Sequence, residues 1–262
     1  MTTFVDSHAH IADPAFDSDR EEVIARARAS GASAIICIGE SVAAAARART
    51  IATEHTDFVF FTAGVHPHDA ASFDPLRDVD AIASEVSLGA VAIGECGLDY
   101  HYDHAPRAEQ RRAFSAQLEL ARGLARPVVV HTRDADGDTR DMVTEAGAAG
   151  VRGVLHCYTG SHQLAEAALA VGWYVSFSGI VTFKKWTDEG LLRLVPDAQL
   201  LAESDAPYLA PVPYRGKRNE PAWVRFTLER LALARAQSVD AVAAIAEANT
   251  RRLFGLAERR MA

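Results

Sequence analysis

The strongest constraint on the fold is a regular alternation of short apolar runs with longer amphipathic segments along the whole chain. β-Rich apolar runs occupy residues 4–8, 33–39, 58–66, 90–95, 127–132, 153–159, 173–179 and 199–205. Segments with helical periodicity separate them, at residues 19–30, 41–54, 74–87, 107–124, 138–149, 161–171 and 187–194. Two more helical segments, 221–236 and 238–248, follow the last run.

This alternation predicts βαβ units and a parallel sheet. Eight strands predict closure into a (β/α)8 TIM barrel, for which 262 residues is a usual length. An open doubly wound sheet is the alternative, but no glycine-rich dinucleotide fingerprint follows any of the runs. No linker, low-complexity tract or sequence repeat indicates a second domain, so we expect one domain over residues 1–262.

Charge and cysteine content limit the partners and the compartment. A net charge of −8 gives no general attraction to nucleic acid or membrane, so an anionic substrate would need local basic loops or metal ions. No apolar run has the length of a membrane span, and no secretory signal is visible. The cysteines Cys37, Cys96 and Cys157 contain no CxxC pair. We therefore expect a cytoplasmic protein without a membrane or obligate protein partner.

Titratable residues recur where the predicted strands end. In a (β/α)8 barrel the C-terminal ends of the strands form the active-site face. His8 and His10 point the same way, because side chains alternate along a strand with a period of 2. Four further residues occupy equivalent places at the ends of other strands: Glu95, His131, His156 and Asp205.

A metal centre explains this set better than six separate structural roles. Any one of these histidines, taken alone, is more simply explained as a hydrogen-bonded core residue. Six titratable residues at the ends of five strands are not explained in this way. Four imidazoles and two carboxylates would be costly to bury unpaired, and divalent cations remove that cost by coordinating them. The pattern favours a binuclear site, in which His8 and His10 bind one ion and Glu95, central in strand order, bridges both.

Seven motifs occur in order between residues 4 and 254: DSHAH, GVHPH, GECGLDY, VVHTRDA, HCYTGS, LLAESDAPYLAP and RGKRNEPAWV. They resemble the motifs of the TatD-type metal-dependent deoxyribonuclease family, within the amidohydrolase-like barrel superfamily. The resemblance implies two divalent ions, for which Mg²⁺, Mn²⁺ and Zn²⁺ are candidates. It implies one ion held by His8, His10, Glu95 and Asp205, and a second held by Glu95, His131 and His156. Ser204 and Cys96 depart from the family pattern, but neither is an implied ligand.

Two buried acids accompany the predicted ligands. Glu203 shares a face with Asp205, so it either orients a ligand or the attacking water, or forms a structural pair. Asp6 stands in the same relation to His8, and for it we favour a structural role deep in the barrel.

Substrate contacts are expected from residues close to the ligands. The resemblance favours His68 as a contact to the substrate phosphate. Arg133 and Tyr158 each follow a predicted ligand by two residues and should face the site. Arg133 suits bidentate phosphate recognition, with a salt bridge to Asp134 as the alternative. Tyr158 is expected to contact or stack on the substrate.

Two basic loops on the predicted active-site side suit nucleic-acid binding. One contains Arg215, Lys217 and Arg218, and the other contains Lys184, Lys185 and Trp186. A solvated surface is the alternative, especially for the lysine pair. Four histidines have no convergent partners in the sequence and are expected at the surface: His55, His101, His104 and His162.

These features predict a hydrolase that cleaves phosphodiester bonds of DNA with metal-activated water. Asp205 would accept the proton of the water, and Glu95 would bridge the metals. The family resemblance favours an exonuclease, whereas the residues by themselves leave exo- and endonuclease action open. One alternative is an amidohydrolase-type ester or amide hydrolase, acting for example on an aminoacyl-tRNA. A non-catalytic metal-binding scaffold is a second alternative, which the complete ligand set disfavours.

Overall fold

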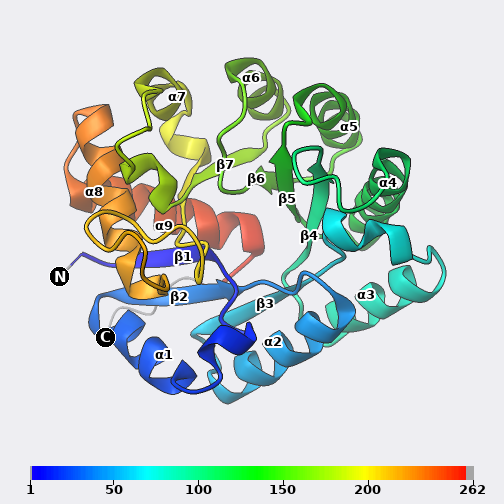
Figure 1. Cartoon of the computed structure of the whole chain (residues 1–262), viewed down its shortest axis with the longest axis horizontal. Helices are drawn as coiled ribbons and strands as arrows, with labels where there is room; N and C mark the ends of the chain where they lie inside the picture. The colour runs from blue at the N-terminus through cyan, green and yellow to red at the C-terminus, as the bar shows by residue number, and fades with distance from the viewer. Residues whose placement is uncertain (1, 258–262) are drawn as a thin grey trace.

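Eight parallel strands form the centre of the computed structural model, which describes residues 2–257 (Figure 1). Each strand pairs with the next one along the chain, from β1–β2 through β7–β8. The strands are β1 (Phe4–Ala9), β2 (Ala32–Cys37), β3 (Val59–Ala63), β4 (Ala92–Asp99), β5 (Val128–Arg133), β6 (Gly153–Leu155), β7 (Tyr174–Phe177) and β8 (Leu200–Ala202). This order confirms the predicted single-domain (β/α)8 barrel.

Backbone bonds just beyond β8 join the last strand to the first. The Asp205 N–H donates to the carbonyl of His8 at 2.9 Å, and the His10 N–H donates to the carbonyl of Ala206 at 2.7 Å. The fully buried carboxylate of Asp6 accepts bonds from the Ser204 hydroxyl at 2.6 Å and from the Ser204 N–H at 2.9 Å. Asp6 therefore has the structural role expected of it, at the junction that closes the barrel.

Helices surround the sheet, and serine side chains cap several of them. Ser41, Ser161 and Ser238 each accept a bond from a backbone N–H in the first turn of the helix that follows. The helices are α1 (Arg20–Ala29), α2 (Val42–Glu54), α3 (Arg77–Ser87), α4 (Arg107–Leu124), α5 (Asp136–Ala148), α6 (His162–Ala170), α7 (Glu189–Leu194), α8 (Val224–Arg235) and α9 (Val239–Phe254). Within residues 2–257, none combines the length and apolar character needed to cross a bilayer.

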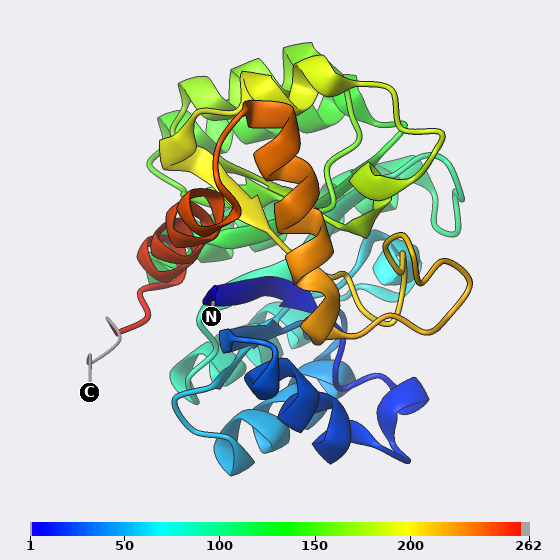
Figure 2. The same cartoon turned by 90° about the vertical axis from the view of Figure 1, so that its left-hand side faces the viewer.

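Two apolar cores lie on opposite faces of the strands. The larger core fills the space between strands and helices and includes Ile35, Phe114 and Trp173. The smaller core fills the barrel interior with residues from successive strands, and the end of α9 packs against it: Ile36, Ala92, Val129, Val154, Leu201, Leu253 and Phe254. Figure 2 shows α9 on the opposite side of the barrel from the loop between β8 and α8. One end of the barrel is thus filled by apolar side chains.

Strand β4 departs from the sequence prediction in length and in alternation. It continues four residues past Glu95, to Asp99. Ile93 packs in the helix-facing core, although regular alternation would place it on the same face as Glu95, two residues on. The register of β4 on β5 is irregular between Ile93 and Cys96, and this irregularity re-aims Glu95 into the barrel. Gly94 permits it, because its φ is 131° and a Cβ there would lie 2.5 Å from the Val129 carbonyl.

Trp173 is the largest side chain buried in the helix-facing core, and its indole N–H donates to the carbonyl of Val151 at 2.7 Å. Trp173→Ala should lower the free energy of unfolding by about 3–5 kcal/mol, since it leaves a large cavity. Urea denaturation followed by circular dichroism measures this loss. Leu233→Ala is the control, because Leu233 is 77% exposed and its removal should change stability by less than about 0.5 kcal/mol. Equal stabilities of the two variants would contradict the packing described.

Candidate metal centre

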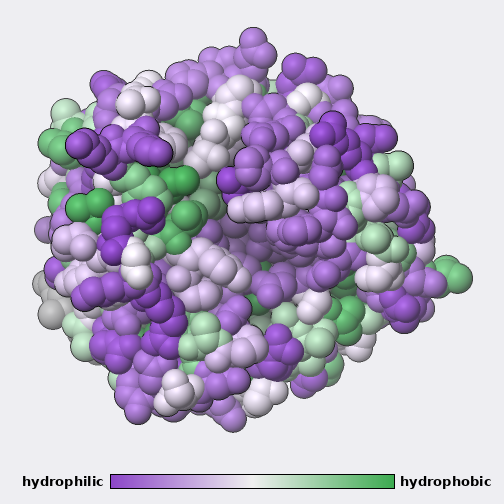
Figure 3. Space-filling model, in the orientation of Figure 1, coloured by the Kyte–Doolittle hydropathy of each residue, from purple (hydrophilic) through white to green (hydrophobic). Residues whose placement is uncertain are grey.

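The C-terminal ends of the strands surround a cavity of about 560 Å³. Figure 3 shows this face of the molecule, with a hollow near its centre bordered mainly by hydrophilic residues. Five of the six predicted ligands line the cavity: His10, Glu95, His131, His156 and Asp205. The sixth, His8, is fully buried, with its ring stacked on that of His156 at a centroid distance of 3.8 Å. The barrel therefore brings all six residues together.

Four of these residues form one compact group of ligand atoms. The Nε2 atoms of His8 and His10 lie 3.1 Å apart. Glu95 Oε2 lies 3.4 Å from the first nitrogen and 3.6 Å from the second. Asp205 Oδ1 lies 3.6 and 3.5 Å from the same two atoms. His8, His10 and Glu95 are spaced as a possible metal-binding group, and so are His8, His156 and Asp205. These nitrogen and oxygen donors suit a divalent cation.

The other oxygen of Glu95 faces a second group of imidazoles. Glu95 Oε1 lies 2.8 Å from His156 Nε2 and 3.3 Å from His131 Nδ1. His66 Nε2 lies 3.4 Å from the same oxygen, and His66, Glu95 and His131 are spaced as a possible metal-binding group. Strand alternation assigns no role to His66, because Pro67 ends that alternation after β3. Its place in the motif GVHPH is the sequence feature that could have identified His66 as a site residue.

Electrostatics around Glu95 match a cation-binding role. Burial alone would raise the pKa of Glu95, but the charges of His156 and His66 and hydrogen bonds from His131 and His156 hold that pKa well below its usual range. The carboxylate is therefore ionised although its residue is only 2% exposed. His156 Nε2 is buried 2.8 Å from Glu95 Oε1 without a well-directed hydrogen bond, so it is the ring nitrogen that would face a metal ion.

Three carboxylates orient the imidazoles by contacting the ring nitrogen that points away from the centre. Glu203, fully buried, accepts a hydrogen bond from His156 Nδ1 at 3.2 Å and one from the Cys157 N–H at 2.8 Å. Glu40 pairs with His10 Nδ1. Asp99 Oδ2 lies 3.0 Å from His131 Nε2 and 2.9 Å from His68 Nε2. Carboxylates that hold the free ring nitrogen fix the tautomer and direction of metal-binding histidines.

Of these three carboxylates, only Glu203 was predicted from the sequence; Glu40 and Asp99 were not. Asp99 lies at the end of β4, which the pattern ended at Glu95, and Glu40 lies beyond the end of β2. Asp99 belongs to the motif GECGLDY, and this is the sequence feature that could have identified it as a site residue. No comparable signal distinguishes Glu40 from a surface acid, because only folding brings it to His10.

Two glutamines on one face of α4 hold the backbone next to the centre. The amide of Gln117 accepts a bond from the Val65 N–H at 2.9 Å and donates to the Val65 carbonyl at 3.0 Å. Gln110 makes the same pair of bonds with Asp99, at 2.7 and 3.0 Å. Both glutamines are fully buried. Each amide thus pairs with the N–H and carbonyl of one residue, as a neighbouring strand would, and so holds the segments that carry His66 and Asp99.

The predicted substrate residues fall into two groups. His68 and Arg133 line the cavity. Arg215 and Lys217 are exposed on the loop after β8, where Arg215 lies over the Phe183 ring at 3.6 Å and Lys217 over the Tyr214 ring at 5.4 Å. The structure therefore leaves the two loop cations exposed to solvent near the barrel face that carries the cavity.

Two predicted contacts are corrected. Tyr158 is 1% exposed, and its hydroxyl donates to the Ser161 carbonyl at 2.6 Å, so the ring does not reach the cavity. The backbone turns at Cys157, whose φ is 43°, and this breaks the alternation on which that prediction rested. The guanidinium of Arg218 donates to both oxygens of Asp19, at 2.8 and 2.6 Å, and is committed to this salt bridge.

The four histidines expected at the surface lie there. His55 lies beside Glu21 and His162 beside Asp188, both in exposed pairs. His101 and His104 are exposed on the loop after β4, and the ring of His104 lies 4.6 Å from that of His68.

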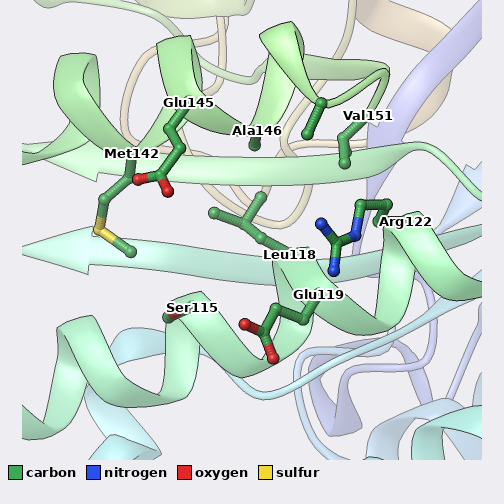
Figure 4. Close-up of a pocket in the computed structure, with 9 residues that line it drawn as sticks. Ser115, Leu118, Glu119, Arg122, Met142, Glu145, Ala146 and Val151 are labelled. Carbon is green, nitrogen blue, oxygen red and sulfur yellow. The ribbon is translucent and has the colours of Figure 1, made fainter.

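A smaller cavity of about 160 Å³ lies outside the barrel, between α4 and α5. Figure 4 shows the side chains of Glu119, Arg122, Met142 and Glu145 around it. All its lining residues belong to the outer helices or the turn after α5, so it is separate from the histidine cluster.

A parallel (β/α)8 barrel with imidazoles and carboxylates at the C-terminal ends of its strands is the architecture of metal-dependent barrel hydrolases. The family model described as TatD related DNase matches residues 5–255. The chain is 38% identical over 252 residues to the "uncharacterized metal-dependent hydrolase YabD" of Bacillus subtilis, covering 95% of this chain and 98% of that protein. The chain belongs to the TatD family of metal-dependent hydrolases, as its motifs predicted.

Relatives named as nucleases show similar coverage. The "3'-5' ssDNA/RNA exonuclease TatD" of Rahnella sp. is 38% identical over 251 residues, covering 94% of this chain and 95% of the relative. Among solved structures, the TatD homologue YJJV of Escherichia coli superposes with a TM-score of 0.89 at 26% identity, covering 97% of this chain and 98% of that one.

The glutamine bonds to Val65 predict a stability effect. Gln117→Met keeps the length of the side chain but leaves the buried N–H and carbonyl of Val65 without partners. We expect the free energy of unfolding to fall by about 2–4 kcal/mol, measured by urea denaturation. Gln163→Met, at an exposed position on α6, is the matched control and should have little effect. A Gln117 variant as stable as this control would show that the two bonds are not needed.

Proposed function

We propose that this protein is a two-metal phosphodiesterase that cleaves DNA, with Glu95 as the bridging ligand. The observation that supports it is the division of one buried carboxylate between two groups of nitrogens. Glu95 Oε2 faces His8 and His10, whereas Oε1 faces His131 and His156. We assign Asp205 to the first ion, beside His8 and His10.

Divalent ions in these positions would lower the pKa of a coordinated water and neutralise charge on the phosphoryl oxygens. Imidazole nitrogens suit Zn²⁺ or Mn²⁺, and carboxylates also suit Mg²⁺, so all three remain candidates. The chain's own residues bind the substrate and accept the proton that the attacking water releases. We assign to Asp205 the acceptance of a proton from the attacking water.

Phosphate recognition is assigned to His68 and Arg133. Both line the cavity that contains Glu95 and Asp205. Arg133 offers N–H donors to phosphate oxygens, and protonated His68 would offer Nδ1–H. His68 Nε2 is held by Asp99, the same carboxylate that holds His131. This shared partner would keep the phosphate contact in a fixed relation to the metal ligand.

The exposed cations beside the cavity favour a polyanionic substrate. Arg215 and Lys217 are exposed on the loop after β8, and Lys184 and Lys185 are exposed on the loop after β7. The Val212 N–H donates a hydrogen bond to the Thr182 hydroxyl at 2.9 Å, and this bond joins the two loops. In a chain with a net charge of −8, this local positive surface supports binding of a nucleic-acid backbone.

Incubation of end-labelled single-stranded and duplex oligonucleotides with Mg²⁺, Mn²⁺ or Zn²⁺ tests the proposed reaction. We expect a product ladder that is abolished by a chelator and restored by metal. Asp205→Asn should reduce kcat by more than about 100-fold, because proton acceptance and a charged ligand are both lost. Its circular dichroism should match the native protein. Full activity of a folded Asp205→Asn variant, or hydrolysis of acyl esters without any cleavage of oligonucleotides, would contradict the proposal.

The two loop arginines should respond differently to substitution. Arg215→Ala should raise the KM for an oligonucleotide and reduce the slope of log KM against log salt by about 0.7, since one phosphate contact is lost. Arg218→Ala is the matched control: it should lower the melting temperature, because the salt bridge to Asp19 is removed, and leave the slope unchanged. KM measured at four or five salt concentrations decides between them. Equal slopes for Arg215→Ala and the native protein would exclude Arg215 from the binding surface.

A further inference from the structure

Tyr102, on the loop between β4 and α4, is a large aromatic residue that lines the cavity and remains 52% exposed. Its ring meets that of His68 edge-on, with centroids 5.7 Å apart and planes at 88°. His68 in turn shares the Asp99 carboxylate with His131. The exposed ring is therefore separated from the proposed metal ligands by a single side chain.

The position of this ring is fixed by its neighbours. The guanidinium carbon of Arg133 lies 4.9 Å from the ring centroid of Tyr102. The ring of His104 is parallel to it within 4°, at a centroid distance of 5.6 Å. The Tyr102 N–H donates to Asp99 Oδ1 at 2.9 Å, so the carboxylate that holds His131 also holds this loop. We call Tyr102, His104 and Arg133 the Tyr102 wall.

We propose that the Tyr102 wall binds the nucleobase of the nucleotide that adjoins the phosphate being cleaved. The inference rests on the proposed function. Unstacked bases bind on aromatic rings and on arginine guanidinium planes, and the wall offers both beside the cavity. The cavity volume of about 560 Å³ is sufficient for a group of nucleotide size.

Phosphate and base contacts would then lie side by side. Arg133 belongs to the wall and also lines a neighbouring cavity of about 540 Å³, so it stands where a chain leaving the metal centre would pass. A base bound on the wall is unavailable for stacking within a duplex. The wall would therefore favour substrates whose bases near the cleaved bond are already unstacked.

The test compares oligonucleotides that differ by one base. In two modified substrates, the nucleotide on one side or the other of the cleaved bond is abasic. For the native protein we expect kcat/KM to be about five- to hundredfold higher with the intact substrate than with one of the abasic ones. Tyr102→Ala and Tyr102→Leu should bring this ratio close to one, whereas Tyr102→Phe should retain it.

Leu233→Ala, on the outer surface of α8, is the control and should show the native ratio. Melting temperatures establish that each variant is folded, and Tyr102→Leu retains apolar bulk if the alanine variant is unstable. A native protein that does not distinguish the abasic substrates overturns the inference, and so does a native ratio in both the Ala and Leu variants. Hydrolysis of methyl p-nitrophenyl phosphate without any cleavage of oligonucleotides would instead refute the proposed function, and the inference with it.

Discussion

The buried carboxylate of Glu95 is the point on which the rest of the site depends. Five imidazoles have a ring nitrogen within 3.6 Å of one of its oxygens, at distances from 2.8 to 3.6 Å: His8, His10, His66, His131 and His156. A buried charge is costly unless it is paired. Together with Glu95, these side chains come from five separate places around the barrel, so the electrostatic balance of the site exists only when the barrel is closed.

Hydrogen bonds made by buried polar side chains, more than apolar packing, hold the residues of this centre in place. Asp6 and Ser204 join the first and last strands, which places His8 and His10 beside Asp205. Gln110 and Gln117 hold the segments after β3 and at the end of β4, where His66 and Asp99 lie. The two apolar cores lie elsewhere, between the helices and strands and at the opposite end of the barrel. Packing thus stabilises the scaffold, whereas polar contacts orient the ligands.

The rim of the cavity has two chemically different sides. One side consists of His68, Arg133 and Tyr102, which form a network around Asp99. The loops after β7 and β8 supply exposed cations on the other side. Arg218 belongs to the same basic motif, yet its guanidinium is occupied by Asp19. The number of basic residues in this motif is therefore larger than the number of cations available to a substrate.

The sequence by itself determined the barrel and the strand-end positions of the six convergent residues, because strand periodicity and strand-end placement are local patterns. His131 and Asp205 reached the site as those patterns predicted. Only the tertiary structure decided the rest. Glu95 faces inward through an irregular strand register, Tyr158 turns away after a left-handed residue, and Asp99, Glu40 and His66 join the centre across distant segments. The periodicity of a single strand contains no information about such departures, since they are fixed by the contacts between neighbouring strands and loops.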